Sequence, residues 1–274
     1  MRPTEQAGFE SALSSSLGPI LEIEALPTGT SGQSYRVMTS TGLYVAKRFF
    51  SDAPVLLSPA AQFELLSMLA RERIGPAPVG FDTEERVLIT RFVEAGSPAS
   101  PDALGRTPLI ERMASTLRSL HASRGSAPRF DPARYAGRYL EAAGGPESLT
   151  DHDRTRYEEL SHLAAGFERE PACLCHNDLV ADNVLVGARI TLIDFDYAVS
   201  APPILDLANF SEMNGFNADQ TMALTSAYYG EDVPYSADEF ASVRRLVQLL
   251  AHFWSLASAR NGAAIVANYR MEDV

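Results

Sequence analysis

The sequence predicts an α+β protein of two lobes, in which a small antiparallel β-sheet with one main helix precedes a larger, mostly helical lobe. Three observations predict this fold class. Strand-like runs separated by Gly-rich turns begin at residue 20, helical periodicity fills most of the chain beyond residue 100, and a Pro- and Ser-rich stretch lies between them. We place the lobe boundary at that stretch, with residues 1–93 in the first lobe and residues 94–274 in the second.

Composition narrows the kinds of partner. Hydrophobic residues make up 46% of the chain, and no apolar run approaches the roughly 20 residues that span a bilayer. The N-terminus lacks the basic start and apolar core of a signal peptide, so we expect a cytoplasmic protein with no membrane partner. A net charge of −12 argues against nucleic acid, which requires a basic surface. The same charge favours a cationic small molecule, or serves only to keep the protein soluble.

The first lobe opens with a short amphipathic helix over residues 4–17. Strands follow over residues 20–26, 33–39 and 43–50, with turns at PTGTSG and STG between them. A further strand over residues 86–93 ends at the lobe boundary. These runs are expected to form the sheet of the first lobe.

A lysine stands within the third of these strands. Alternation along residues 43–50 places Lys47 on what we take to be the apolar face, where its ammonium needs an anion because an unpaired buried charge is costly. The helix expected over residues 58–75 offers a carboxylate, Glu64, at the edge of its buried face. Two other glutamates are alternatives to it, Glu22 and Glu72.

Helical periodicity organises the second lobe. Helices are expected over residues 107–123, 136–145, 151–167, 204–216, 219–230 and 237–262. Short β-rich runs interrupt them at residues 173–175, 184–186 and 190–193. The first run holds both cysteines of the chain, Cys173 and Cys175, which we expect to point to opposite faces of the strand as reduced core thiols.

Polar residues stand at the ends of these short runs. Asp178 and Asn183 bracket a tight loop, and Asp194 ends the next apolar run. The Asn183 amide and the Asp194 carboxylate are oxygen donors that can converge on a hard cation such as Mg²⁺, which leaves Asp178 to accept a proton from an attacking hydroxyl. Phosphoryl transfer needs these parts, because its transition state requires in-line positioning and charge neutralisation. The stretch therefore predicts a phosphotransferase rather than only a polar cap over buried strands.

The motifs CHNDLVADNVLV and LIDFDYA resemble those of the aminoglycoside phosphotransferase and choline kinase superfamily, the small-molecule relatives of protein kinases. Asn177 stands where protein kinases carry Arg, and Asp196 where they carry Gly. The DYA run is similar to the Glu-Tyr-Ser/Ala of choline and ethanolamine kinases, and DLANF looks like their Asp-Ile-Gly-Asn. The resemblance is closest to that branch, and it implies a bilobal protein-kinase-like fold.

The resemblance also implies ATP and Mg²⁺ as cofactors, with the first lobe binding the nucleotide. The turn before the second strand would cover the phosphates through Gly29, Ser31 and Gly32. Lys47 would hold the α- and β-phosphates, with Glu64 supporting its ammonium. The residues just before the lobe boundary, called the hinge, are expected to contact adenine through their backbone: Arg91, Phe92 and Val93.

On the acceptor side the resemblance implies an acidic and aromatic pocket for a quaternary ammonium group. Four positions are expected in it, Asp196, Tyr197, Glu212 and Trp254. Trp254 is the only tryptophan and lies in HFWSLA, which resembles the choline kinase segment Trp-Gly-Leu-Trp with Ala257 in place of the second Trp. A tryptophan at helical spacing can equally belong to the core.

We therefore expect an ATP-dependent kinase that phosphorylates the hydroxyl of a small cationic alcohol, choline first and ethanolamine second. An aminoglycoside or macrolide kinase is an alternative within the enzyme class, because those acceptors are also cationic. An inactive kinase fold kept as a nucleotide-binding regulatory module is a third hypothesis. The intact set of Lys47, Asp178, Asn183 and Asp194 argues against it.

Overall fold

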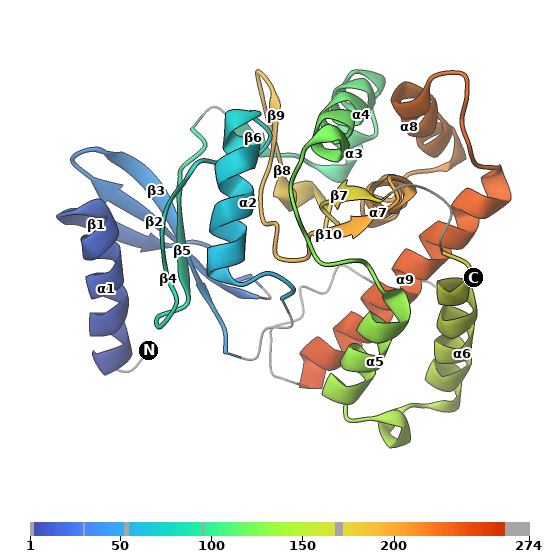
Figure 1. The fold of residues 1–274 in the computed structure, drawn as a ribbon, viewed down its shortest axis with the longest axis horizontal. Coiled ribbons are helices and arrows are strands. Elements are labelled where there is room, and N and C mark those ends of the chain that lie inside the picture. Colours follow the sequence, from blue (N-terminus) through green and yellow to red (C-terminus); the bar gives the residue numbers. More distant parts are fainter. Residues whose placement is uncertain (1–2, 30, 52–54, 95, 168–171, 261–274) are drawn as a thin grey trace.

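The computed structural model describes residues 3–29, 31–51, 55–94, 96–167 and 172–260. Figure 1 shows a sheet with flanking helices at one end of the molecule and a mostly helical lobe at the other. The predicted α+β fold class is confirmed. Among the described residues, no helix combines the length and the apolar character that a membrane crossing requires.

The first lobe is built on a five-stranded antiparallel sheet with the strand order β1-β2-β3-β5-β4. Its strands are β1 (Ile20–Ala25), β2 (Gly32–Thr39), β3 (Gly42–Phe49), β4 (Pro78–Asp82) and β5 (Val87–Arg91). Helix α1 (Pro3–Leu17) packs on one face of the sheet and helix α2 (Pro59–Arg71) on the other (Figure 1). Only β4 was not expected, because PVGFD shows no alternation of apolar and polar residues.

The two faces of β3 meet different surroundings. Tyr44 and Ala46 are buried against Phe9 and Leu13 of α1, whereas Lys47 lies on the other, half-buried face. The alternation along the strand is as predicted, and Lys47 shares its face with Phe49, which is buried in the larger core. Both faces of the sheet receive a helix, because α1 covers the face of Tyr44 and α2 covers the other face.

The start of helix α2 and its buried face follow from its sequence. Ser58 caps it by accepting the backbone N–H of Ala61, and Pro59 occupies the first turn, where a missing N–H costs nothing. Its apolar face is fixed in the core by three leucines, Leu65, Leu66 and Leu69. This burial sets the rotation of the helix about its axis, which decides which polar side chains of α2 face the second lobe.

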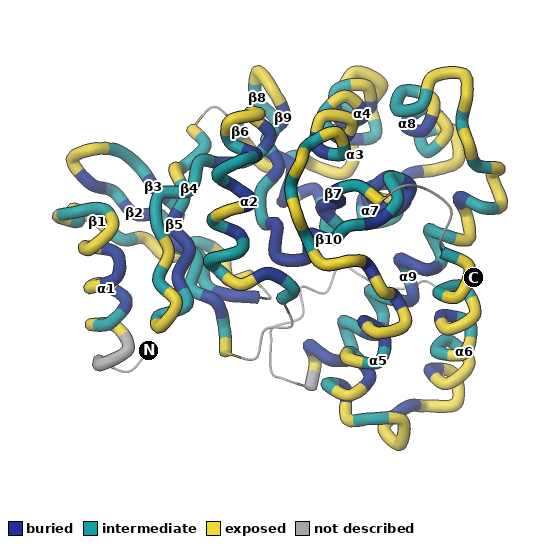
Figure 2. The backbone as a smooth tube through the Cα atoms, viewed as in Figure 1, coloured by how far each residue is buried: buried dark blue, intermediate teal, exposed yellow. Residues whose placement is uncertain are grey.

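The second lobe is mostly helical. Its helices are α3 (Pro101–Leu104), α4 (Thr107–Ala122), α5 (Pro132–Ala142), α6 (Asp151–Ala165), α7 (Ile204–Met213), α8 (Ala218–Tyr229) and α9 (Ala237–Arg260), with short 3₁₀ turns η1 (Pro146–Ser148) and η2 (Ala181–Asn183). Residues 204–211 of α7 are all buried, so this helix forms the centre of the lobe (Figure 2). Each helix that was expected from periodicity is present.

Two small sheets connect the lobes and carry the polar residues singled out in the sequence. Strands β6 (Gly96–Pro98), β8 (Val184–Gly187) and β9 (Ile190–Leu192) form one sheet, and β7 (Cys173–Cys175) pairs with β10 (Val199–Ala201) in the other. Residues 176–183, between β7 and β8, are called the site loop below. The site loop and the segment after β9 lie side by side, because the Ile193 N–H donates to the Asn183 backbone oxygen at 3.0 Å.

Candidate active site

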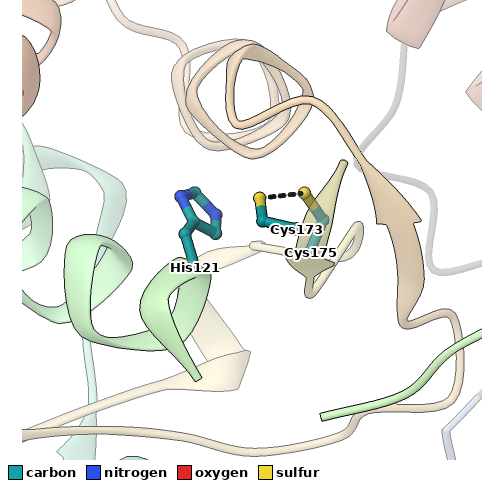
Figure 3. A group of neighbouring side chains, drawn as sticks. All are labelled: His121, Cys173 and Cys175. Atoms are coloured by element: carbon teal, nitrogen blue, oxygen red, sulfur yellow. Dashed lines mark hydrogen bonds between the residues drawn. The ribbon is translucent and has the colours of Figure 1, made fainter. Parts of the chain in front are cut away.

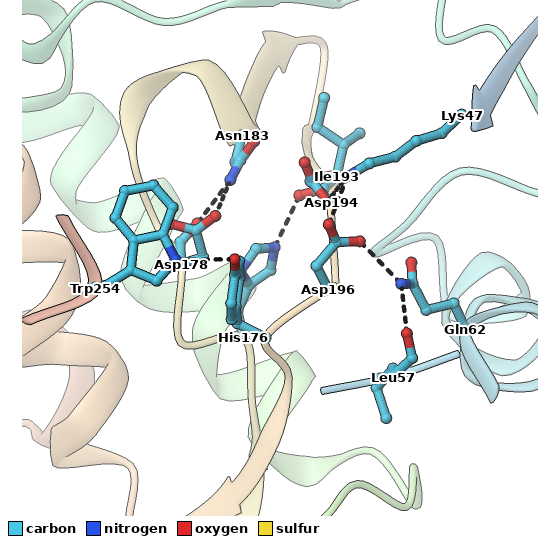
Figure 4. Close-up of polar contacts among 11 residues, drawn as sticks. Lys47, Leu57, Gln62, His176, Asp178, Asn183, Ile193, Asp194, Asp196 and Trp254 are labelled. Carbon is cyan, nitrogen blue, oxygen red and sulfur yellow. Dashed lines mark hydrogen bonds and ion pairs between the residues drawn. The ribbon is translucent and has the colours of Figure 1, made fainter. Parts of the chain in front are cut away.

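The site loop places Asp178 and Asn183 in direct contact. The Asn183 amide Nδ2 donates to the Asp178 backbone oxygen at 2.9 Å and to Asp178 Oδ2 at 3.0 Å. Because both amide hydrogens are used in this way, Asn183 Oδ1 is directed away from Asp178. The loop therefore offers one carboxylate and one separate amide oxygen (Figure 4).

Helix α7 holds the backbone of the site loop. Asp206, which is fully buried, accepts the backbone N–H groups of His176 and Asn177, each at 2.8 Å. Asn209 Oδ1 accepts the N–H of Leu179 at 2.7 Å. These bonds attach the site loop to helix α7, so the buried helix sets the position of the loop backbone.

His176 joins the site loop to the neighbouring segment. Its Nε2 is 2.9 Å from the backbone oxygen of Ile193, and its ring lies 4.4 Å from the ring of Phe195. Burial lowers the pKa of His176, which keeps the imidazole neutral near pH 7. The imidazole of the motif therefore links two segments of the site through its contacts with Ile193 and Phe195.

Lys47 reaches from β3 across to the segment after β9. Its Nζ donates to Asp194 Oδ1 at 2.7 Å and to Asp196 Oδ2 at 2.6 Å (Figure 4). The structure thus brings Lys47 and Asp194 together from positions 147 residues apart. Lys47 is also the only lysine of the chain, which has 22 arginines, a signal in the composition that points to this position. An ammonium is a compact point charge, unlike the broad guanidinium of arginine.

Two carboxylates, Asp194 and Asp196, bind this one ammonium, and its charge also acts on a third, Asp178. Burial alone would lower the pKa of Lys47, but Asp194 and Asp196 outweigh it and raise that pKa. Burial, with help from Asp194 and Asp196, raises the pKa of Asp178 to about 7. Burial and the charge of Asp194 raise the pKa of Asp196 to about 6. The region therefore carries more negative charge than its own residues neutralise, which favours a bound cation.

Two residues of the site have a backbone conformation that is uncommon for non-glycine residues. Asn177 has φ of 60° and Asp194 has φ of 67°, in the left-handed region. Asn and Asp tolerate this region better than other side chains, and such conformations gather at functional sites. At Asp194 the turn lets its side chain face Lys47 directly after β9.

Asn183 and Asp194 fit a divalent metal ion. Asn183 Oδ1 is directed away from Asp178. The Asp194 carboxylate bonds Lys47 through Oδ1 and also has hydrogen bonds with Asp196, and its oxygens retain lone pairs for a further ligand. Mg²⁺ prefers such oxygens, in sites that combine one or two carboxylates with phosphates and water. The excess of negative charge around Asp178 also favours a bound cation.

Glu64 does not support Lys47, so this expectation is wrong. Helix α2 exposes Glu64 and buries Gln62, which is 2% exposed. Gln62 Nε2 donates to Asp196 Oδ1 at 2.9 Å and to the backbone oxygen of Leu57 at 3.2 Å. Residues two positions apart on a helix lie about 200° apart around its axis, so only one of the two can face the site.

The carboxylate of Asp196 faces Lys47 and Gln62, not the acceptor side where we expected it. Asp196 Oδ2 accepts from Lys47 and Asp196 Oδ1 accepts from Gln62, and the side chain is 1% exposed. Asp194, two residues earlier in the chain, also bonds Lys47. The apolar packing of α2 turns the amide of Gln62 toward this carboxylate.

Glu212 is also placed differently from our expectation of an open negative charge. Glu212 Oε2 accepts from Arg244 Nε at 3.1 Å and from Arg244 Nη2 at 2.9 Å. Glu212 Oε1 accepts from Gln248 Nε2 at 2.9 Å. Both partners lie on α9, which packs against α7. Helix α9 therefore supplies a cation that pairs with the charge of Glu212.

Aromatic side chains gather next to Asp178. Trp254 is half-buried and donates its Nε1–H to Tyr197 Oη at 3.1 Å, in the part of the site that Figure 4 shows. Burial raises the pKa of Tyr139, and the charges of Tyr135 and Asp178 add to the rise. Sequence reasoning missed Tyr139, because its helix carries no motif.

The turn between β1 and β2 contains the glycines expected over the phosphates. The Gly29 N–H donates to the Gly32 backbone oxygen at 3.2 Å, and Ser31 and Gly32 are buried. A Cβ at Gly32 would lie 2.4 Å from the backbone oxygen of Arg48, so the close approach of β2 to β3 requires glycine here. The structure thus explains Gly32 without a ligand, and the contact of this turn with phosphates stays a prediction.

The hinge residues differ in what their backbone can offer. Arg91 donates its N–H to Ala77 at 2.8 Å, and Phe92 donates to Leu43 at 3.0 Å. Within the described part of the chain, the N–H of Val93 makes no such backbone bond. Of the three expected positions, Val93 therefore retains a backbone donor for a ligand, and the adenine contact stays a prediction.

A second group of metal-binding side chain types adjoins the start of the site loop, because Cys175 directly precedes it; Figure 3 shows the three side chains. The Sγ atoms of Cys173 and Cys175 are 3.8 Å apart, and a ring nitrogen of His121 lies within 4.8 Å of them. Our expectation of opposite faces is wrong, because residues two apart in a strand share a face. His121 already bonds Tyr228 Oη at 2.7 Å and Asp206 at 3.1 Å, so both its nitrogens are used within the protein. The group packs against the site loop as a structural cluster.

Comparison with known proteins gives a family and several relatives. A model of the phosphotransferase enzyme family matches residues 22–251. The protein LicA of Haemophilus influenzae is 24% identical over 177 residues, which cover 61% of this chain and 51% of LicA. The chain thus spans about half the length of this curated relative.

Solved structures show the same fold. Choline kinase LicA from Streptococcus pneumoniae has a TM-score of 0.81 at 20% identity, over 94% of this chain and 92% of that one. An ADP-bound aminoglycoside phosphotransferase has a TM-score of 0.64 at 18% identity, over 97% and 92% of the two chains. At these identities the likeness establishes the kinase-like fold and leaves the acceptor open.

Proposed function

The chain belongs to the phosphotransferase enzyme family, and we propose that it transfers the γ-phosphoryl group of ATP to the hydroxyl of a small cationic alcohol, choline first and ethanolamine second. The observation that carries the proposal is the ammonium of Lys47 bound to Asp194, with Asp178 and Asn183 in contact alongside. Phosphoryl transfer depends on positioned phosphates and neutralised charge, and these residues have the chemistry for both.

We assign the nucleotide to the first lobe, residues 1–93, and the catalytic and acceptor residues to residues 94–274. Lys47 would bind the α- and β-phosphates, and the N–H of Val93 would bind adenine, with Arg91 beside it. The turn residues over the phosphates would be Gly29, Ser31 and Gly32. An ADP complex of an aminoglycoside phosphotransferase with the same fold supports nucleotide binding.

Asn183 Oδ1 and Asp194 would hold Mg²⁺, which when bound neutralises charge on the phosphate oxygens. In the structure Asp194 shares its negative charge with Lys47. Nucleotide binding would therefore free the Lys47 ammonium from Asp194 and let it turn to the phosphates.

We assign Asp178 as the group that accepts the hydroxyl proton. The acceptor oxygen forms a bond to the γ-phosphorus, the bond from that phosphorus to the bridging oxygen of ADP breaks, and the hydroxyl proton passes to the Asp178 carboxylate. A pKa of about 7 suits this role, because a general base works best near the pH at which it operates. The amide of Asn183 keeps the carboxylate in position at 3.0 Å.

The acceptor proposal rests on the aromatic group beside Asp178. Trp254, Tyr197 and Tyr139 offer ring faces, and each cation–π contact contributes about 0.5 to 2 kcal/mol. Glu212 is paired with Arg244, so aromatic faces, more than free carboxylates, would bind the cation. This favours choline, whose quaternary nitrogen has no N–H to donate. The fold likeness to a choline kinase supports the same choice.

An aminoglycoside acceptor fits the acidic residues less well. Such an acceptor carries several ammonium groups that need carboxylate partners, whereas Asp196 and Glu212 are already paired with Lys47 and Arg244. The likeness to an aminoglycoside phosphotransferase is in the fold. We therefore keep the antibiotic kinase as the alternative that the assay must exclude.

A coupled assay of ADP release tests the proposal. Purified protein with MgATP is supplied with choline, ethanolamine, an aminoglycoside or a macrolide, and we expect choline to give the highest kcat/KM. Trp254→Phe should raise the KM for choline about tenfold and leave the KM for ATP unchanged, because it removes the indole face and its bond to Tyr197. A higher kcat/KM for an antibiotic would refute the choline assignment. Binding of MgATP without any acceptor turnover would support the inactive module.

A further inference from the structure

Gln62 occupies a position that phosphoryl transfer alone does not explain. It is 2% exposed on α2 and bonds Asp196, which in turn bonds Lys47. Figure 4 shows this series of contacts from Leu57 through Gln62 and Asp196 to Lys47. None of the sequence motifs includes Gln62.

The site requires a double hydrogen-bond donor at Gln62. Its Nε2 faces two acceptors, Asp196 Oδ1 at 2.9 Å and the backbone oxygen of Leu57 at 3.2 Å. An amide nitrogen carries two hydrogens and can donate to both, whereas a carboxylate only accepts. A glutamate of the same size would therefore oppose both contacts and add a fourth carboxylate near Asp178, Asp194 and Asp196.

Asp196 is held from two directions by the segment before and within α2. Its backbone oxygen accepts the N–H groups of Leu56 at 2.9 Å and Leu57 at 3.3 Å, and its side chain accepts from Gln62. Leu57 thus contacts both Asp196 and Gln62, which closes a compact hydrogen-bonded unit. The unit fixes the one Asp196 oxygen that remains for Lys47.

We propose that Gln62 is a positioning residue, which fixes Asp196 and through it holds the Lys47 ammonium ready for nucleotide phosphates. The inference rests on the proposed function, because that function assigns Lys47 to the phosphates and Asp194 to the metal ion. When Asp194 binds the metal ion, Asp196 becomes the carboxylate that retains Lys47. A partner in a fixed place lowers the cost of ordering the ammonium when the nucleotide binds.

Binding of MgADP, measured by calorimetry without any acceptor, tests the inference. Gln62→Met keeps the length of the side chain and removes both donors, and Gln62→Glu keeps its shape and reverses its hydrogen bonding. Each should raise the dissociation constant for MgADP on the order of tenfold or more, as expected for a lost hydrogen bond to a charged group. The control is Glu64→Gln, an exposed position on the same helix, which should leave the constant unchanged.

A double-mutant cycle with Lys47→Ala separates positioning from a general effect on the fold. If Gln62 acts through Lys47, Gln62→Met should have no further effect on MgADP binding once Lys47 is absent. Lys47 is the only lysine of the chain, so ¹³C-labelled lysine gives a single side-chain NMR signal. That signal should shift in Gln62→Met without nucleotide and stay in place in Glu64→Gln.

Unchanged MgADP binding in both Gln62 variants would overturn the inference, as would equal losses with and without Lys47. Thermal unfolding identifies a variant that fails to fold, in which case Gln62→Ala replaces it in the same cycle. Failure of the proposed function is a different result, because it would appear as absent acceptor turnover in the unsubstituted protein, whatever MgADP binding shows.

Discussion

Asp178→Asn should make the protein more stable while it removes catalysis. The folded protein holds the pKa of Asp178 at about 7, against an ordinary value of 3.8, because burial and the charges of Asp194 and Asp196 oppose ionisation. Above pH 7 the carboxylate is charged in both the folded and the unfolded state, so the folded state bears this cost in full. Asparagine is neutral and can still accept the Asn183 amide.

The difference between 3.8 and about 7 corresponds to at most about 4 kcal/mol at 1.36 kcal/mol for each pH unit. Asp178 is half-buried and water reaches part of it, so we expect a gain of about 2 kcal/mol at pH 8. The gain should shrink as the pH falls from 7 and vanish below about 4, where Asp178 is protonated in both states. Turnover should fall by a factor on the order of 100 to 10,000.

Urea unfolding at pH 5 and pH 8, with a chelator and without nucleotide, measures the change in stability, and the coupled assay measures turnover. Asp182→Asn is the matched control, because Asp182 is exposed in the same loop and its replacement should change neither quantity. A variant at Asp178 that is less stable at pH 8, or equally stabilised at both pH values, would refute the electrostatic reasoning. Full turnover would refute the assignment of Asp178 as the base.

Three further changes test the framework around the site. Gly32→Ala should lower the free energy of unfolding by about 1 to 3 kcal/mol in urea, because its Cβ would meet the Arg48 backbone oxygen at 2.4 Å. Burial favours a higher pKa for Asp153, but its hydrogen bonds, which include one from His252, outweigh burial and lower that pKa. Asp153→Asn should therefore reduce stability at neutral pH, and thermal unfolding should show the stability of the variant converging with that of the unsubstituted protein as the pH falls below 3.8. Asp206→Asn should cost about 1.5 to 3 kcal/mol in urea and lower kcat, because it replaces one acceptor of the site-loop N–H groups by a donor.

Matched controls exist for each of these changes. Gly137→Ala lies in α5 with open space around its Cβ and should be neutral or stabilising. Asp151 is exposed, so Asp151→Asn, the control for Asp153→Asn, should leave the dependence of stability on pH unchanged. Asp232 is also exposed, so Asp232→Asn, the control for Asp206→Asn, should leave kcat unchanged. A stable Gly32→Ala protein, a stability difference at Asp153 that persists at pH 3, or normal turnover of Asp206→Asn would each contradict the corresponding packing or charge argument.

Local patterns predict much of this protein. Strands and helices were predicted because alternation and helical periodicity reflect burial along one element, and the family resemblance is confirmed. Asp178 and Asn183 could be paired in advance, since five residues separate them in one loop. An anion near Lys47 was expected because a buried ammonium needs one, but the partners named were phosphates and Glu64, and the direct contact with Asp194 was not foreseen.

What was missed depends on how elements rotate against one another. Glu64 and Gln62 lie on the same helix, and only the packing of α2 decides that the amide faces the site. Glu212 and Arg244 are far apart in the chain on two helices, and no local pattern indicates that they pair. Tyr139 reaches the aromatic group because α5 packs beside α9, which again follows from the tertiary arrangement.

The sulfur pair behind the site loop bears on how chemical modification of this protein would be understood. Cys175 directly precedes His176, and Cys173 is half-exposed next to His121, which bonds the same Asp206 that holds the loop. An alkylating agent that reaches Cys173 would wedge the imidazole away from Asp206 and distort the backbone around His176. Inactivation by such an agent, slowed by bound nucleotide, would then reflect a displaced support and would not identify a nucleophilic thiol.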